Sequence, residues 1–158
     1  MHLPVMEDDL CSVGTSNVAF VSHSFLADML MKSPALMRAF WRETLIDAAI
    51  YRAWVGSLGS LRSLPRLAHL ICELAARLEI VGLLQNDSFE FPLTQQNLAD
   101  ACGLSTVHVN RTVQELRQRG LIEWEGRAIR LLKRRELEAL AEFNPDYLHV
   151  GKYADTWA

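Results

Sequence analysis

Cysteine and long apolar runs are both scarce in this sequence. The three cysteines, Cys11, Cys72 and Cys102, are odd in number and far apart, so they form neither a disulfide framework nor a zinc-binding spacing. We therefore expect a reducing compartment and a cytoplasmic protein. No uncharged apolar run approaches the roughly 18 residues of a membrane span, and an acidic run at residues 7–9 stands where a signal peptide has a basic segment. We expect no membrane partner.

Motifs for catalysis and metal binding are also lacking. The sequence has no Ser-His-Asp order, no glycine-rich phosphate loop, and five histidines without ligand spacing. We expect neither an enzyme nor a metal site. Half of the residues are hydrophobic, which excludes a disordered chain and predicts a folded core.

The net charge of −3 is unevenly distributed along the chain. Taken whole, this mild acidity argues against a nucleic-acid binder. Residues 94–135, however, hold eight Lys or Arg against four Asp or Glu, a net of +4, whereas residues 1–93 carry −3 and residues 136–158 carry −4. The positive charge is therefore concentrated in one segment, as a DNA-binding surface requires.

The first third of the chain predicts one strand, one short helix and one long helix. Residues 17–21 read as a strand, and residues 24–31 read as a short helix with its apolar side chains on one side. Ser33 is a candidate N-cap and Pro34 suits the first position of a helix. The long helix is expected to continue to about Ser57.

The long helix carries a heptad pattern and is expected to end at Gly59. Apolar residues recur along it at alternating steps of four and three, which is the spacing of a helix that pairs with another helix. Additional apolar residues on neighbouring faces, Leu36, Phe40, Leu45 and Ala49, indicate that it is contacted on more than one side. The expected dimerisation residues are Met37, Trp41, Thr44, Ala48, Tyr51, Val55 and Leu58.

A second helix is predicted over residues 61–84, with Pro65 in its first turn. Residues 89–91 then alternate like a short strand. The apolar stripe that we expect this helix to bury in the core consists of Leu67, Leu70, Ile71, Leu74, Leu78 and Val81.

Residues 94–131 predict a helix-turn-helix followed by a hairpin. Thr94 caps a short helix that ends at Cys102, and Gly103 provides the turn. Ser105 caps the next helix, which runs through Arg119. The segment 121–131 alternates on both sides of a Glu-Gly pair, so we interpret it as a hairpin wing. The two helices are expected to face a common core through Leu98, Ala99, Leu104, Val109, Val113 and Leu116.

The exposed face of the second of these helices is polar enough to reach base edges. Arginine suits guanine, asparagine and glutamine suit adenine, and valine suits the methyl group of thymine. The candidate base-reading residues are Arg111, Asn110, Val107, Thr106, His108 and Gln114. The candidate phosphate contacts are Thr94, Gln95, Ser105 and Arg127.

Other interpretations of these residues stay open. Ser105 serves as a cap in either case, and His108 fits an idle surface residue as well as a phosphate contact. Arg117 and Arg119 are also explained as solvated charges. Residues 94–131 as a whole fit a packed helical hairpin with no DNA contact.

Four short motifs resemble the C-terminal half of Crp/Fnr-type transcription regulators. They are residues 93–99 (LTQQNLA), 103–105 (GLS), 109–111 (VNR) and 120–122 (GLI), and residues 47–78 resemble the family's dimerisation helix and the helix after it. The resemblance covers about residues 17–150. It implies a mainly α fold with a winged helix-turn-helix, and a homodimer that binds double-stranded DNA at an inverted repeat. RNA polymerase is then a candidate partner. Arg111 matches the family's base-reading arginine, whereas many relatives have Glu where this chain has Val107.

The family's N-terminal β-roll, which binds a cyclic nucleotide or another signal, is represented only by residues 17–21, which resemble its last strand. We therefore expect no cofactor in this chain, and a cyclic nucleotide or other effector only in a form that carries the roll. The resulting division is a sensory-domain remnant (1–32), a dimerisation helix (33–60), a winged helix-turn-helix domain (61–150) and a tail (151–158).

One alternative belongs to a different functional class. Winged helices also serve as protein-interaction modules, so the chain fits a dimeric adaptor without DNA readout. An adaptor would present a contiguous apolar patch where this sequence has Asn110 and Arg111.

Overall fold

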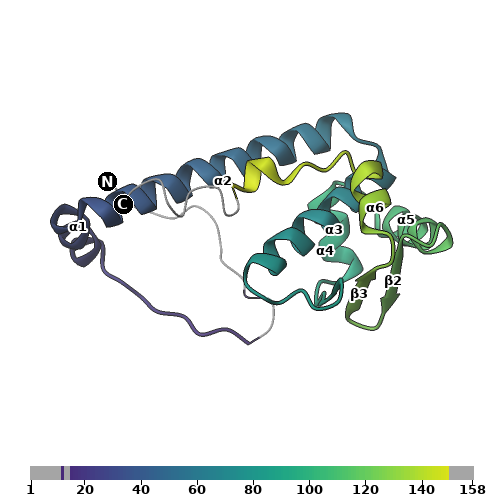
Figure 1. The fold of residues 1–158 in the computed structure, drawn as a ribbon, viewed down its shortest axis with the longest axis horizontal. Helices are drawn as coiled ribbons and strands as arrows, with labels where there is room; N and C mark the ends of the chain where they lie inside the picture. The colour runs from purple at the N-terminus through teal and green to yellow at the C-terminus, as the bar shows by residue number, and fades with distance from the viewer. Residues whose placement is uncertain (1–11, 13–14, 150–158) are drawn as a thin grey trace. The chain divides into compact units, whose positions relative to one another are not determined.

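The computed structural model describes residue 12 and residues 15–149. The fold is mainly helical with one small antiparallel sheet, as the sequence predicts (Figure 1). Two compact units divide the chain between residues 48 and 49, inside the long helix. The elements in order are α1 (His23–Lys32), α2 (Pro34–Ser60), α3 (Ser63–Ile80), β1 (Ser88–Glu90), α4 (Gln95–Cys102), α5 (Thr106–Gln118), β2 (Ile122–Glu125), β3 (Ala128–Leu131), α6 (Arg134–Leu140) and the 3-10 helix η1 (Pro145–Leu148).

The start of α2 follows the predicted signal at Ser33, whereas α1 begins one residue earlier than predicted and is capped by Ser22. The Ser22 hydroxyl accepts the backbone N–H of Phe25 at 3.2 Å, and the Ser33 hydroxyl accepts that of Leu36 at 3.3 Å. The predicted strand at residues 17–21 is wrong. A strand needs a neighbour for its backbone groups, and these residues pair with no part of the chain that the structure describes. The long helix α2 also continues past the expected end and closes at Ser60.

Helix α3 is shorter at both ends than its apolar pattern indicates. It begins at Ser63 rather than residue 61, which leaves a two-residue corner after α2, and it ends at Ile80 rather than residue 84. Leu67 and Ile71 are fully buried, as predicted, whereas Val81 is 65% exposed. Val81 was predicted in the core, but the helix ends before it and the residue leaves the apolar stripe.

The core of the second unit lies around α3, which packs against α4, α5 and α6. The hairpin is confirmed, with Glu125 opposite Ala128 across a two-residue turn. Its strand β3 also pairs with β1, which gives the order β1-β3-β2, a pairing that the sequence analysis missed. Trp124 packs edge-on against Phe91 with 5.0 Å between ring centroids, so the wing is fastened to the strand region before the helix-turn-helix.

The described residues offer neither a membrane-spanning helix nor a metal site. No helix among them is both long and apolar enough to cross a membrane. No group of three or more His, Cys, Asp or Glu side chains among them is placed to hold a metal ion.

Candidate nucleic-acid interface

The helix-turn-helix is fixed by caps that the sequence predicts at each position. The Thr94 hydroxyl accepts the backbone N–H of Asn97 at 3.2 Å, and the Asn97 side chain accepts the backbone N–H of Thr94 at 2.9 Å, which completes a capping box. Gly103 ends α4 with a φ of 59°, a left-handed conformation that costs glycine little. The Ser105 hydroxyl then accepts the backbone N–H of His108 at 3.3 Å and starts α5.

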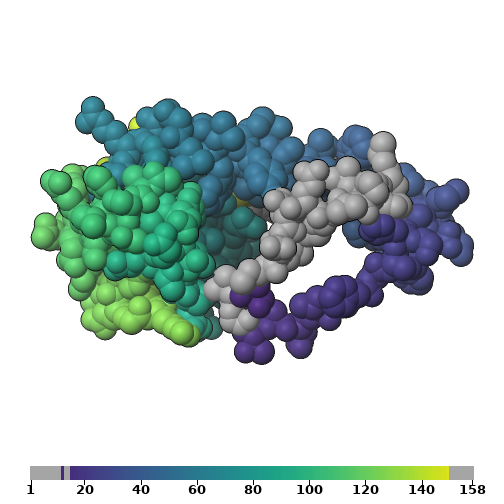
Figure 2. Space-filling model, turned by 180° about the vertical axis from the view of Figure 1, so that it is seen from behind, coloured from purple at the N-terminus to yellow at the C-terminus, as the bar shows by residue number. Residues whose placement is uncertain are grey.

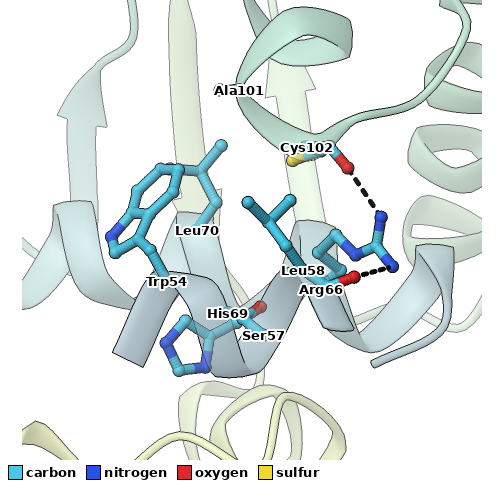
Figure 3. Close-up of a pocket in the computed structure, with 8 residues that line it drawn as sticks. All are labelled: Trp54, Ser57, Leu58, Arg66, His69, Leu70, Ala101 and Cys102. Atoms are coloured by element: carbon cyan, nitrogen blue, oxygen red, sulfur yellow. Dashed lines mark hydrogen bonds between the residues drawn. The ribbon is translucent and has the colours of Figure 1, made fainter. Parts of the chain in front are cut away.

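One arginine from a distant part of the sequence fastens this turn. Arg66, near the start of α3, donates from Nη1 to the carbonyl oxygen of Cys102 at 2.8 Å (Figure 3). Its Nη2 donates to the carbonyl oxygens of Leu58 at 2.9 Å and Leu61 at 2.6 Å. Arg66 therefore ties the turn of the helix-turn-helix to the corner between α2 and α3. No pattern in the sequence around Arg66 predicts this role.

The recognition helix α5 has one apolar and one polar face. Its inner face buries Val109, Thr112, Val113 and Leu116. On the outer face Val107 is 77% exposed. The other base-reading candidates are exposed except for Thr106, which is half-buried; the exposed ones are His108, Asn110, Arg111 and Gln114. The structure thus presents the candidate residues together on the outside of α5, and Val107 is the one large apolar side chain among them.

The phosphate candidates differ in how far their side chains are already engaged. The Thr94 hydroxyl takes part in the capping box and also donates to Asn97 Oδ1 at 2.7 Å. The Ser105 hydroxyl lies 2.9 Å from Nδ1 of His108. Gln95 is exposed in the first turn of α4, where amide groups lack intrahelical partners. Arg127 is exposed in the hairpin turn.

Ion pairing separates the basic residues of this unit into two groups. Arg119, Arg130, Lys133 and Arg134 form ion pairs with carboxylates. Among residues 94–135, the basic side chains that form no ion pair with a described residue are Arg111, Arg117, Arg127 and Arg135. Figure 2 shows the green residues of α4 and α5 as one continuous face of the second unit. Unneutralised positive charge therefore lies on the recognition helix, on the wing turn and at the start of α6.

The two cysteines of this unit are buried among apolar side chains, as predicted. Burial raises the pKa of the Cys72 thiol to about 12 and that of the Cys102 thiol to about 11. Both residues therefore remain thiols at neutral pH and act as small apolar side chains.

Most of the seam predicted on α2 is exposed; Ala48 is half-buried. No residue of α2 is buried among those that the structure describes. Trp41 is 65% exposed and Tyr51 is 72% exposed, and Met37, Val55 and Leu58 are exposed as well. The half-buried residues of its second half, Ile50, Ala53, Trp54 and Ser57, lie on the other side of the helical repeat. An exposed apolar face of this length is typical of a surface that pairs with another helix or chain.

A capped helix-turn-helix, a wing paired antiparallel to the preceding strand and an exposed polar recognition helix define a winged helix-turn-helix protein. Residues 65–140 match the family of Crp-like helix-turn-helix domains. These residues therefore form a Crp-like helix-turn-helix domain, and the chain is similar to transcription regulators of the Crp/Fnr type.

Three relatives illustrate the similarity. The transcriptional activator protein FnrL of Cereibacter sphaeroides is 29% identical over 103 residues, which are 63% of this chain and 42% of that protein. A probable transcriptional activator of Rhizobium leguminosarum bv. viciae is 27% identical over 110 residues, 70% of this chain and 45% of that protein. The structure of FixK2 from Bradyrhizobium japonicum is similar in fold, with a TM-score of 0.69 and 23% identity over 76% of this chain and 59% of that one. This chain spans less than half of the two curated relatives.

Proposed function

We propose that this chain is a sequence-specific DNA-binding transcription regulator that acts as a homodimer on an inverted-repeat site. The observation that carries the proposal is the outer face of α5, where Arg111 and Asn110 are exposed beside other polar side chains and no apolar patch replaces them. In this geometry α5 enters the major groove, Arg111 binds a guanine edge, and Arg127 in the wing turn contacts the backbone. A contact with RNA polymerase stays a prediction.

The first experiment selects duplexes from a random library at two salt concentrations. We expect an inverted repeat with half-site centres about 34 Å apart. Affinity should fall steeply with salt, because each phosphate contact releases condensed counterions. An adaptor without DNA readout would select no sequence, and this result would refute the proposal.

A matched pair of arginine variants separates base reading from phosphate contact. We expect Arg111→Ala to weaken binding to the selected site by about 1–3 kcal/mol per half-site and to relax specificity at one base position. Arg127→Ala should weaken all duplexes equally and reduce the salt slope by about 2 for the dimer, one for each copy. The role of Arg111 is wrong if its variant loses affinity equally for matched and mismatched sites.

The charges beside the apolar seam of α2 favour a parallel pair. In the heptad register of the seam, Phe40 and Asp47 take position g, and Leu45 and Arg52 take position e of the following heptads. In a parallel dimer, Phe40 then lies against the partner's Leu45 and Asp47 against the partner's Arg52. Asp47 and Arg52 are both exposed and form no ion pair with a described residue.

A charge exchange tests this arrangement. Asp47→Arg should weaken dimerisation roughly fivefold or more at low salt, because two attractive pairs become repulsive. Adding Arg52→Asp to this variant should restore dimerisation. The control is Glu43→Arg, at an exposed position that belongs to neither e nor g, and it should leave dimerisation unchanged. Sedimentation measures the dissociation constants. A double variant that dimerises no better than Asp47→Arg alone contradicts the parallel register.

A further inference from the structure

A buried carboxylate joins three segments of the second unit. Glu73, in the middle of α3, is 1% exposed. Its Oε2 accepts the indole N–H of Trp54 from α2 at 2.9 Å and the hydroxyl of Tyr147 from η1 at 2.6 Å. Its Oε1 lies 3.4 Å from Nη1 of Arg77. Burial and the adjacent carboxylate raise the pKa of Tyr147, so its hydroxyl keeps its proton and donates at neutral pH.

Carboxylates are rarely fully buried unless they are paired, so this one needs an explanation. The hydroxyl of Tyr147 also lies 3.1 Å from Nε2 of His69, whose Nδ1 lies 3.3 Å from the carbonyl oxygen of Ala141. The network therefore connects α2 both to α3 and to the segment after α6. No part of it lies on the exposed face of α5, so DNA contact does not account for it.

The network gives α2 a second attachment to the domain. The first is at the corner, where Arg66 binds the carbonyl oxygen of Leu58. Trp54 lies one turn before Leu58, about 6 Å along the helix axis, and Glu73 lies about 10 Å along α3 from Arg66. A single attachment beside a two-residue corner leaves α2 free to pivot, whereas two attachments at separate points fix its direction.

A shallow hollow lies between these attachments. It occupies about 220 Å³, solvent included, between the last turns of α2, the start of α3 and the end of α4 (Figure 3). Trp54, Leu58 and Arg66 line it.

We propose that Trp54, Glu73 and Tyr147 are positioning residues that lock the angle between α2 and the DNA-binding domain, and thereby set the half-site spacing that the dimer accepts. This inference rests on the proposed function, because in a dimer paired along α2 the direction of that helix places the two recognition helices. One base pair of added spacing moves a half-site by about 3.4 Å and rotates it by about 35°. A dimer with a locked angle therefore discriminates strongly between spacings.

The test compares binding to the selected site with binding to versions whose half-sites are one or two base pairs closer or farther apart. Trp54→Phe removes the N–H donor and Tyr147→Phe removes the hydroxyl, and each keeps an aromatic ring. We expect each variant to reduce the ratio of affinities for the optimal and the altered spacings by a factor of about 2–10, which corresponds to the free energy of one hydrogen bond. Affinity for a single half-site should stay the same.

Ile129→Val is the matched control, because Ile129 is fully buried in the same domain but outside the network. It should reduce stability to a similar extent and leave the spacing preference unchanged. The proposal is overturned if Trp54→Phe and Tyr147→Phe have the same spacing preference as the unsubstituted chain, or if Ile129→Val changes that preference as much as they do.

A measurement without DNA separates this inference from the proposed function. Spin labels at Glu43 in α2 and Arg130 in β3, in dimers diluted with unlabelled chain, report the direction of α2 relative to the domain as a distribution of distances between the two labels. Trp54→Phe should broaden that distribution. An unchanged width would refute the proposal that Trp54 fixes the direction of α2. A chain that binds no duplex, but whose distribution broadens in this way, would refute the DNA-binding proposal and retain the lock.

Discussion

Replacing Gly103 with alanine tests how the turn of the helix-turn-helix is held. Gly103 has a φ of 59°, and a Cβ there would lie 3.7 Å from Cδ2 of Leu58 and 3.8 Å from Nη1 of Arg66, which are ordinary contacts. Space is therefore available, and the cost comes from the backbone alone. A left-handed conformation costs a residue with a Cβ roughly 1–2 kcal/mol. We expect Gly103→Ala to lower the free energy of unfolding by about 1 kcal/mol, or about 2–4 °C in Tm.

The same substitution in α2 provides a control of opposite sign. A Cβ at Gly56 meets nothing within 4 Å and the backbone there is helical, so Gly56→Ala should stabilise the chain by about 0.5–1 kcal/mol. Urea unfolding at one fixed chain concentration measures both variants. Gly103→Asn should lower the free energy of unfolding less than Gly103→Ala does, because asparagine adopts the left-handed conformation more readily than alanine. The reasoning fails if Gly103→Ala is as stable as the original chain, or if Gly103→Asn is the worse variant.

Two further predictions follow from the pKa values. The hydrogen bond from Arg134 holds the pKa of Glu79 below its usual value. The ion pair therefore stabilises the fold at a pH above the unfolded pKa of about 4.3. This stabilisation is lost as the pH falls through the lower pKa of the folded state. Glu79→Gln should therefore lower the free energy of unfolding by less than about 1 kcal/mol at pH 7 and leave it unchanged at acidic pH, as measured by urea unfolding at a series of pH values. In a Cys11→Ser chain, the thiols of Cys72 and Cys102 should react with a thiol reagent at pH 8 only as fast as the domain opens; rapid labelling of the native chain would contradict their burial.

Local signals account for the parts of the fold that the sequence predicts well. The capping residues Thr94 and Ser105 and the turn residue Gly103 act within three or four positions of themselves, so their effect is visible in a short window. The hairpin turn between Glu125 and Ala128 is local in the same sense. The candidate base-reading face follows from these boundaries, since they fix which side of α5 is buried.

Long-range partners account for what the sequence could not predict. Arg66 bonds to a carbonyl group 36 positions away, and Glu73 to a hydroxyl 74 positions away. Only the folded arrangement brings these groups together. The wrong strand at residues 17–21 has a related cause, because alternation describes a side-chain pattern and not the neighbour that a strand requires.

The pairing of β1 with β3 has a consequence for how the domain forms. Phe89 lies opposite Ile129, so the sheet closes a loop of about forty residues that contains both helices of the helix-turn-helix. Closing a loop of this length costs chain entropy before the contacts inside it form. The recognition helix should therefore become ordered together with the wing in one cooperative step, and a peptide limited to residues 94–119 should not fold alone. Shortened versions for DNA-binding work need to begin before β1 and end after β3.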